Sequence, residues 1–205
     1  MKSSRRISSG PCATIASVRF LPYLFPAMWF AYISYWWAMT ANVKSDARRE
    51  PVGSRLQRLL LIVLATVLLV PRIRLSVLDG RFLPASTWWF WIGAAVTASG
   101  LGFSVWARRY LGRNWSRAVT IKKDHELITG GPYSLVRHPI YAGLLLALFG
   151  CALALGEWRG LVAVSLVFVG LLRKLRLEEQ WLREQFGASY ENYSKQVRTL
   201  VPYIV

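Results

Sequence analysis

The sequence predicts an all-α integral membrane protein with five transmembrane helices, and three observations lead to this fold class. Of its 205 residues, 54% are hydrophobic, and the mean hydropathy is +0.33. No charged residue lies between Arg19 and Lys44 or between Arg81 and Arg108. Each of these stretches exceeds the roughly 20 residues with which a helix crosses about 30 Å of hydrocarbon. A third uncharged stretch, residues 140–156, is close to the minimum length for another span.

Two further spans are predicted from shorter apolar stretches, residues 59–71 and 160–172. Arginine and lysine residues flank both, and their long side chains can carry the charge to the membrane interface. The spans around residues 20–43 and 82–107 complete the set of five. The first is too long and too aromatic for a cleaved signal peptide, and no small-residue cleavage site follows it.

The distribution of basic residues predicts the orientation in the membrane. The formal net charge is +16, and the basic residues lie in the loops between apolar stretches, which favours lipid head groups over nucleic acid as the acidic partner. With five spans, eight of the 26 basic residues fall on one side of the membrane: Lys2, Arg5, Arg6, Arg19, Arg72, Arg74, Arg81 and Arg159. The side with the larger share is expected to be cytoplasmic. Residues 107–137 and the C-terminal tail are therefore predicted to face the cytoplasm.

The chain divides into three predicted parts: a flexible segment at residues 1–19, transmembrane helices one to three at 20–106, and a functional region at 107–205. In the last part, a long connection ends in a turn at Gly130–Gly131–Pro132. A helical hairpin follows, from Pro139 to about residue 172, and turns at residues 156–159. It continues into a polar C-terminal helix, residues 173–186. Cys12 and Cys151 stand alone, so neither a disulfide nor a metal site is predicted.

The start of the fourth helix brings charged and aromatic residues together. Pro139 suits the first turn of a helix, since its missing N–H is not needed there. Arg137 and His138 would then lie at the cytoplasmic mouth of the helix, with Tyr141 one turn along. Together with the free N–H groups of a helix start, they form a candidate site for an anionic group. The alternative is that these side chains only reach toward the membrane interface.

Two adjacent carboxylates, Glu178 and Glu179, mark the C-terminal helix. They border an apolar stripe at helical spacing, which consists of Leu175, Leu182 and Phe186. Carboxylates beside a face that docks on protein or membrane are costly unless a cation meets them. The alternative is ordinary pairing along the helix, because Lys174 precedes Glu178 by four residues and Arg183 follows Glu179 by four.

Taken together, these motifs resemble the isoprenylcysteine carboxyl methyltransferase family and the related membrane phospholipid methyltransferases. The resemblance covers residues 115–203, a little under half of the chain. The motifs that carry it, in the order of the family, are His125-Glu126-Leu127-Ile128, Gly131-Pro132-Tyr133, Arg137-His138-Pro139 with Tyr141 and Gly143, Glu178-Glu179, Phe186-Gly187 with Tyr190 and Tyr193, and Val201-Pro202. The combination is specific, whereas the Arg-His-Pro motif alone is weak.

The resemblance implies methyl transfer from S-adenosylmethionine, in a site formed by the cytoplasmic loop, the start of the fourth helix and the C-terminal helix. The residues that it places against the cofactor are His125, Glu126, Leu127, Ile128, Tyr133, His138, Pro139, Ile140 and Tyr141. By charge, Arg137 suits the carboxylate of this cofactor and Glu179 its cations, while Tyr133 or Tyr141 could stack on adenine or sulfonium.

For the acceptor, the resemblance places Lys174 and Glu178 near the substrate as the catalytic pair. An arginine would be expected at position 174, and a lysine cannot make the same bidentate contact with a carboxylate. The implied acceptor is lipophilic: the carboxylate of a prenylated cysteine or a similar group. The alternatives are a phospholipid amine or a thiol as acceptor, a sterol-reductase-like enzyme that uses NADPH, and a membrane protein without catalysis.

Overall fold

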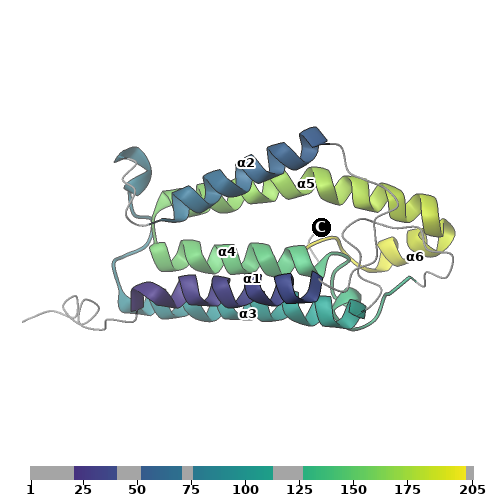
Figure 1. Ribbon diagram of the computed structural model, residues 1–205, viewed down its shortest axis with the longest axis horizontal. Coiled ribbons are helices and arrows are strands. Elements are labelled where there is room, and N and C mark those ends of the chain that lie inside the picture. Colours follow the sequence, from purple (N-terminus) through teal and green to yellow (C-terminus); the bar gives the residue numbers. More distant parts are fainter. Residues whose placement is uncertain (1–20, 41–51, 71–75, 113–126, 202–205) are drawn as a thin grey trace, which may run out of the picture.

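The structure, a computed structural model, describes residues 21–40, 52–70, 76–112 and 127–201. Within these residues every regular element is a helix, and the backbone pairs in sheet fashion only at two isolated bridges. The prediction of an all-α fold is therefore confirmed. Most of the helices run lengthwise beside one another, and the shorter α6 (Ala188–Gln196) lies at one end (Figure 1).

The N-terminal half contributes α1 (Leu24–Thr40), preceded by the short η2 (Leu21–Tyr23), then α2 (Val52–Leu69) and η3 (Ser76–Asp79). Helix α2 begins earlier than the predicted span at 59–71, so polar residues that precede the span, such as Gln57 and Arg58, are helical as well. A hydropathy pattern detects only the apolar part of a helix, and polar residues can extend the same helix beyond it.

Helix α3 (Thr87–Leu111) also extends beyond its uncharged stretch. Ser86 caps its start, because the Ser86 hydroxyl accepts a hydrogen bond from the backbone N–H of Trp88 at 3.3 Å. Near its end the helix holds Arg108, which is only 5% exposed. The Arg108 guanidinium donates to the carbonyl oxygens of Gly112 and Met39 at 3.1 and 3.4 Å. The positive charge thus ties the end of α3 to the end of α1.

Helices α3 and α4 (Pro139–Leu155) pack with their backbones in close approach. A Cβ atom on Gly100 would lie 2.5 Å from the carbonyl oxygen of Gly143 and from the backbone nitrogen of Ala147. Likewise, a Cβ on Gly150 would lie 2.5 Å from the backbone nitrogen of Thr97. Glycine at these positions therefore allows the two helices to touch, as small residues do between membrane helices.

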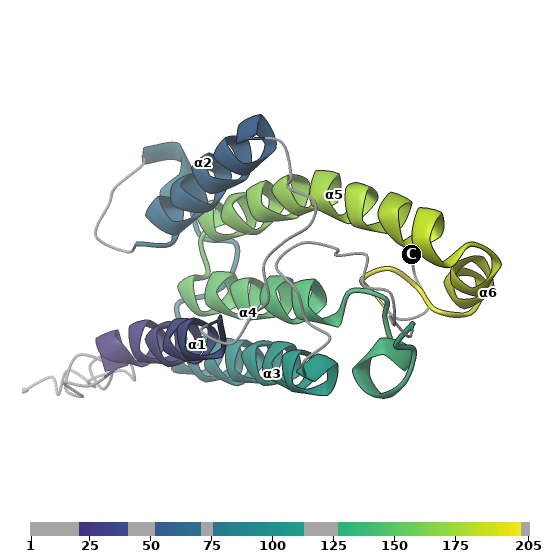
Figure 2. The same ribbon diagram turned by 45° about the vertical axis from the view of Figure 1, so that its right-hand side comes forward.

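The second half forms the hairpin that was predicted. Helix α4 starts at Pro139, and Gly156 ends it in the left-handed conformation, with φ of 67°. Helix α5 (Trp158–Phe186) then runs without interruption through the predicted fifth span and the predicted C-terminal helix. It packs against both α4 and α2. Figure 2 shows α6 just beyond the end of α5, on the side of the start of α4.

Of the five predicted spans, the structure supports one by length and composition. Among the described helices, α3 alone is long and apolar enough to cross a bilayer, while the segments Leu56–Leu69 and Pro139–Leu155 are apolar but shorter. Large apolar side chains are exposed on the outside of the bundle, among them Phe30 and Trp37 on α1 and Leu60 on α2, at 74%, 81% and 66%. Exposed apolar surface of this extent marks contact with lipid or with another protein.

Candidate active site

The start of α4 is held by the C-terminal end of the chain. The backbone N–H of Arg137 donates to the carbonyl oxygen of Arg198 at 2.7 Å, and that of His138 to Thr199 at 3.0 Å. His138 is the N-cap residue of α4, and Pro139 follows at the first helical position, as predicted. The residues after α6 thus lie alongside the Arg-His-Pro motif in a short parallel pairing.

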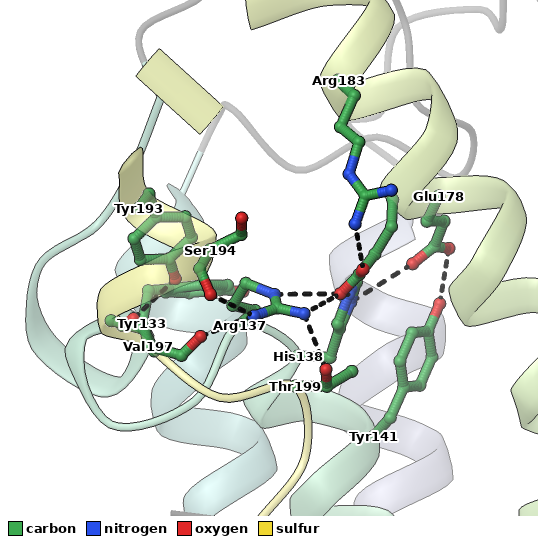
Figure 3. A network of polar contacts seen from close by, with 11 residues as sticks. Tyr133, Arg137, His138, Tyr141, Glu178, Arg183, Tyr193, Ser194, Val197 and Thr199 are labelled. Atoms are coloured by element: carbon green, nitrogen blue, oxygen red, sulfur yellow. Dashed lines mark hydrogen bonds and ion pairs between the residues drawn. The ribbon is translucent and has the colours of Figure 1, made fainter. Parts of the chain in front are cut away.

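The guanidinium group of Arg137 forms all of its hydrogen bonds with groups of the protein itself. Its Nε and Nη2 atoms donate to Oε1 of Glu179 at 2.9 and 2.6 Å. Nη1 donates to the carbonyl oxygens of Ser194 and Val197 at 3.0 and 2.6 Å, and Nη2 also donates to the Thr199 hydroxyl at 2.7 Å. An arginine carries five N–H donors, and each of the five has an acceptor here. Figure 3 shows the guanidinium between these C-terminal residues and α5.

His138 lies between the two adjacent glutamates. Its side chain is only 6% exposed, with Nδ1 at 3.6 Å from Oε2 of Glu178 and Nε2 at 3.4 Å from Oε1 of Glu179. Both distances are longer than good hydrogen bonds, and among the described residues no group forms a hydrogen bond with Nε2. His138, which the sequence placed at the cytoplasmic mouth of the fourth helix, is therefore buried at the start of α4. The C-terminal residues that cover it come from a distant part of the chain.

Glu179 is the more tightly held of the two carboxylates. Burial by itself raises the pKa of a carboxyl group, but the contacts from His138 and Arg137 and the charge of Arg137 outweigh it. The net effect lowers the pKa of Glu179 to about 2. Arg183 adds a longer ion pair, with its Nη2 at 3.6 Å from Oε2 of Glu179. Glu179 is thus a permanent anion over the physiological range.

Glu178 has a different set of partners. The Tyr141 hydroxyl donates to its Oε1 at 2.7 Å, and Nζ of Lys174 lies 3.5 Å from the same oxygen. The Lys174 ammonium also lies 5.2 Å from the centroid of the Tyr141 ring, within the range of a cation–π contact. The Tyr141 ring also stacks on His138, with centroids 5.9 Å apart and planes at 24°. These contacts form a small group of charged and aromatic side chains.

Tyr133 is held by a contact with α6. Gly131, at φ of 58°, begins η5 (Gly131–Ser134), a single turn of 3-10 helix at the place where the paired glycines predicted a turn. Tyr133 is only 9% exposed, and its carbonyl oxygen accepts a hydrogen bond from the Tyr193 hydroxyl at 2.6 Å. Burial raises the pKa of Tyr133 well above its ordinary value. The contact joins η5 to α6.

The structure brings most of the predicted site residues together. Arg137, His138, Tyr141, Lys174, Glu178 and Glu179 are joined by direct contacts. Pro139 is fully buried beside them, and Ile140 is half-buried in the next position of α4. Leu127 and Ile128 are half-buried in the segment that leads to η5, and their role stays a prediction. His125 and Glu126 lie outside the described residues.

The C-terminal residues were not predicted to be part of the site. Ser194 and Val197 act through backbone carbonyl oxygens, which every residue has, so no sequence signal marks them. Thr199 and Tyr193 act through side chains, and Tyr193 belongs to the family resemblance without an assigned role.

The apolar stripe predicted beside Glu178 and Glu179 is partly correct: Leu175 is buried, while Leu182 and Phe186 are half-buried. Among the described residues, no cluster of metal-binding side chains is present.

Comparison with known families agrees with this arrangement. Residues 88–189 match the model of a family described as phospholipid methyltransferase. The match starts with α3 and ends at the start of α6, so it contains Arg137, His138, Glu178 and Glu179. This region of the chain, which holds the site, belongs to that methyltransferase family. The resemblance inferred from the motifs is therefore confirmed.

Curated relatives point to one branch of these enzymes. The chain is 38% identical over 96 residues to the protein-S-isoprenylcysteine O-methyltransferase of Schizosaccharomyces pombe, which covers 45% of this chain and 41% of the relative. It is 36% identical over 96 residues to a probable protein-S-isoprenylcysteine O-methyltransferase of Oryza sativa subsp. indica, an alignment that covers 45% of this chain and 50% of that relative. It is also 36% identical over 100 residues to the protein-S-isoprenylcysteine O-methyltransferase of Saccharomyces cerevisiae, an alignment that covers 45% of this chain and 40% of that relative. The alignments thus span half or less of these relatives.

Proposed function

We propose that this protein is an integral membrane methyltransferase that transfers a methyl group from S-adenosylmethionine to a lipophilic acceptor. The observation that carries the proposal is the cluster of His138, Tyr141, Lys174 and Glu178, in a region that matches the methyltransferase family. The favoured acceptor is the carboxylate of a prenylated cysteine or a similar group, in line with the names of the relatives.

The described residues fit this cofactor. S-adenosylmethionine carries an ammonium and a sulfonium cation, and the cluster holds two carboxylates, of which Glu178 has fewer and longer cationic contacts than Glu179. The imidazole of His138 has a buried nitrogen without a hydrogen bond among the described residues, which is a position where a ligand group or a water is expected. The face of an aromatic ring, such as that of Tyr141, attracts a cation. We assign His138, Tyr141, Glu178 and residues 125–128 to the cofactor side.

When bound, the cofactor would supply a methyl group on a positively charged sulfur atom. Methyl transfer is an in-line displacement, so the protein mainly has to align the two reactants and exclude water. Glu178 is oriented by the Tyr141 hydroxyl at 2.7 Å, and Lys174 is held beside it by that carboxylate and by the Tyr141 ring. Lys174, at 24% side-chain exposure, can meet an acceptor carboxylate. A carboxylate nucleophile has no proton to lose, so this mechanism requires no general base.

A phospholipid amine is the second candidate acceptor. The lysine at position 174 favours it, because an arginine there would indicate a carboxylate acceptor instead. A lysine forms a point contact and not the bidentate contact that suits a carboxylate. Here the Lys174 ammonium is already engaged by Glu178 and by the Tyr141 ring. An amine acceptor must also lose a proton, and Glu178 would be the carboxylate nearest to receive it. The family description names phospholipids as well.

For the membrane we propose five spans, with the active site and the C-terminus facing the cytoplasm. Support comes from the apolar helix α3, the shorter apolar segments, the apolar side chains exposed on α1 and α2, and the excess of basic residues in the loops assigned to the cytoplasm. A site at the end of a bundle in the membrane would admit a lipophilic acceptor from the bilayer and a soluble donor from the cytoplasm.

The test is to incubate the purified protein with S-adenosylmethionine labelled in its methyl group and with synthetic acceptors. These are a farnesylated cysteine derivative with a free carboxylate, its methyl ester, a phosphatidylethanolamine and a thiol. Label in the free acid and none in the ester supports the first acceptor, and label in the phospholipid supports the second. No label in any acceptor or in a membrane extract, together with binding of NADPH, would contradict the proposal in favour of a reductase.

A further inference from the structure

Arg137 stands in the motif from which the cofactor site was inferred, but its contacts in the structure all lie within the protein. The five N–H donors of its guanidinium are taken by Glu179, Ser194, Val197 and Thr199. The side chain is only 9% exposed, and its shortest ion pair, to Oε1 of Glu179, measures 2.6 Å. An additional carboxylate would have to displace one of these acceptors.

The acceptors come from two parts of the chain that are far apart in sequence. Glu179 belongs to α5, while Ser194 lies in α6 and Val197 and Thr199 lie just after it. The backbone adds two hydrogen bonds, from the N–H groups of Arg137 and His138 to the carbonyl oxygens of Arg198 and Thr199. We call this set the C-terminal clamp: the guanidinium of Arg137 together with Ser194, Val197, Arg198 and Thr199.

The C-terminal clamp holds His138 in two ways, through its side-chain neighbour Glu179 and through its backbone. It fixes Glu179, whose Oε1 lies 3.4 Å from Nε2 of His138, and it covers the backbone before α4. The opposite ring nitrogen of His138 faces Glu178, and its ring stacks on Tyr141. The position of the imidazole, and through it that of the group around Glu178, therefore depends on the clamp.

We propose that Arg137 is a positioning residue that orders the site through the C-terminal clamp, and that it does not contact the carboxylate of the methyl donor. This inference rests on the proposed function, since it describes how the same site is held. It assigns a role to residues 194–199, which lie beyond the region that matches the family model. The clamp joins the helix that starts the site to the last described part of the chain.

The experiment compares two ligands that differ only in the group in question. S-adenosylhomocysteine carries the carboxylate, and its decarboxylated derivative lacks it. Their dissociation constants are measured with the full-length protein in detergent for the wild type, Arg137→Lys and Thr199→Val. Arg176→Lys serves as the matched control, because Arg176 is an exposed arginine on α5 outside the clamp. Hydrogen exchange of the backbone amides of residues 137 and 138 is measured in the same samples without ligand.

We expect Arg137→Lys to weaken both ligands by the same factor, about tenfold or more, as the loss of hydrogen bonds between charged groups predicts. The amides of residues 137 and 138 should exchange faster, because their acceptors in the C-terminal segment are released. Thr199→Val removes one acceptor and leaves Arg137 in place, so it should show both effects to a smaller extent. It keeps the test valid should Arg137→Lys fail to fold.

A loss confined to the ligand with the carboxylate would overturn the proposal, because it would show direct contact with Arg137. Unchanged exchange at residues 137 and 138 in both variants would overturn it as well, since the clamp would then not hold the segment. Faster exchange with unchanged affinity for both ligands would show a structural role without positioning. If the wild type binds neither ligand, the proposed function fails, and the exchange data still decide whether the clamp exists.

Discussion

The hydroxyl of Tyr141 donates a hydrogen bond of 2.7 Å to Oε1 of Glu178 and so connects the first turn of α4 to α5. The two residues are far apart in sequence, and both come from motifs that suggested a site. Because Lys174 lies over the same ring and near the same carboxylate, the hydrogen bond fixes a cation, an anion and an aromatic face together.

Tyr141→Phe should lower the turnover number by about tenfold or more. The variant keeps the ring that stacks on His138 and contacts Lys174, but it removes the donor to Glu178. A hydrogen bond to a charged group contributes about 1.5–3 kcal/mol, which corresponds to roughly ten- to more than a hundredfold in rate. Tyr23→Phe, at a residue that is 68% exposed, is the control. Full turnover in Tyr141→Phe would remove this hydrogen bond from the mechanism.

The two glutamates should respond differently to replacement by glutamine. Glu178→Gln is expected to lower turnover at saturating donor by about tenfold or more, because Glu178, besides its place on the cofactor side, holds Lys174 in position to meet the acceptor. Glu179→Gln is expected chiefly to weaken donor binding, since Glu179 holds His138 and Arg137 in place. The measurement is turnover against each substrate separately, beside a melting curve. If both variants keep more than about half of wild-type turnover, the effect is no larger than that of helix-surface pairing, and the active site proposed here is wrong.

The lowered pKa of Glu179 predicts how the stability of the folded protein changes in acid. Its pKa is lowered from an ordinary value of 4.5 to about 2 in the folded protein. The folded state thus binds the proton less readily than the unfolded state, so this group stabilises the protein above pH 4.5. That contribution should be lost as the pH falls from about 4.5 to about 2, and the midpoint of thermal unfolding in detergent should fall with it. In Glu179→Gln, the part of the decline that belongs to this group should be missing.

Two glycines on α3 offer a matched test of its packing on α4. A Cβ atom on Gly100 would lie 2.5 Å from backbone atoms of Gly143 and Ala147, whereas Gly102 has nothing within 4 Å of that position. Gly100→Ala should therefore destabilise the protein by about 1–3 kcal/mol through overpacking. Gly102→Ala should be neutral or slightly stabilising, because alanine is the better helix former. Equal melting temperatures for the two variants would contradict the close approach of the helices.

The basic residues predict the orientation in the membrane. A reporter that is active only in the cytoplasm, fused after residue 205, should be active, and one that needs the opposite compartment should be inactive. The reason is that 18 of the 26 basic residues are assigned to the same side as the C-terminus. The reverse result would place the site away from its soluble donor and would contradict both the topology and the route of the cofactor.

The sequence by itself determined the helical fold and the chemical groups of the site. Uncharged stretches located the apolar helices, and Pro139 and Gly156 set the limits of α4 because their backbone preferences act locally. The spacing of Lys174, Glu178 and Glu179 placed them on one helix by the same local rules. The combination of motifs also led to the family, which the matched region confirms.

Only the tertiary structure decided which of these groups pair. Glu178 and Glu179 are neighbours in the sequence, but they point in different directions around α5, so one meets Tyr141 and the other meets Arg137. The partners of Arg137 include the carbonyl oxygens of Ser194 and Val197, which exist in every residue and leave no mark in a sequence. Their positions depend on how α6 returns to the start of α4. That return is set by packing between distant segments, which local preferences do not specify.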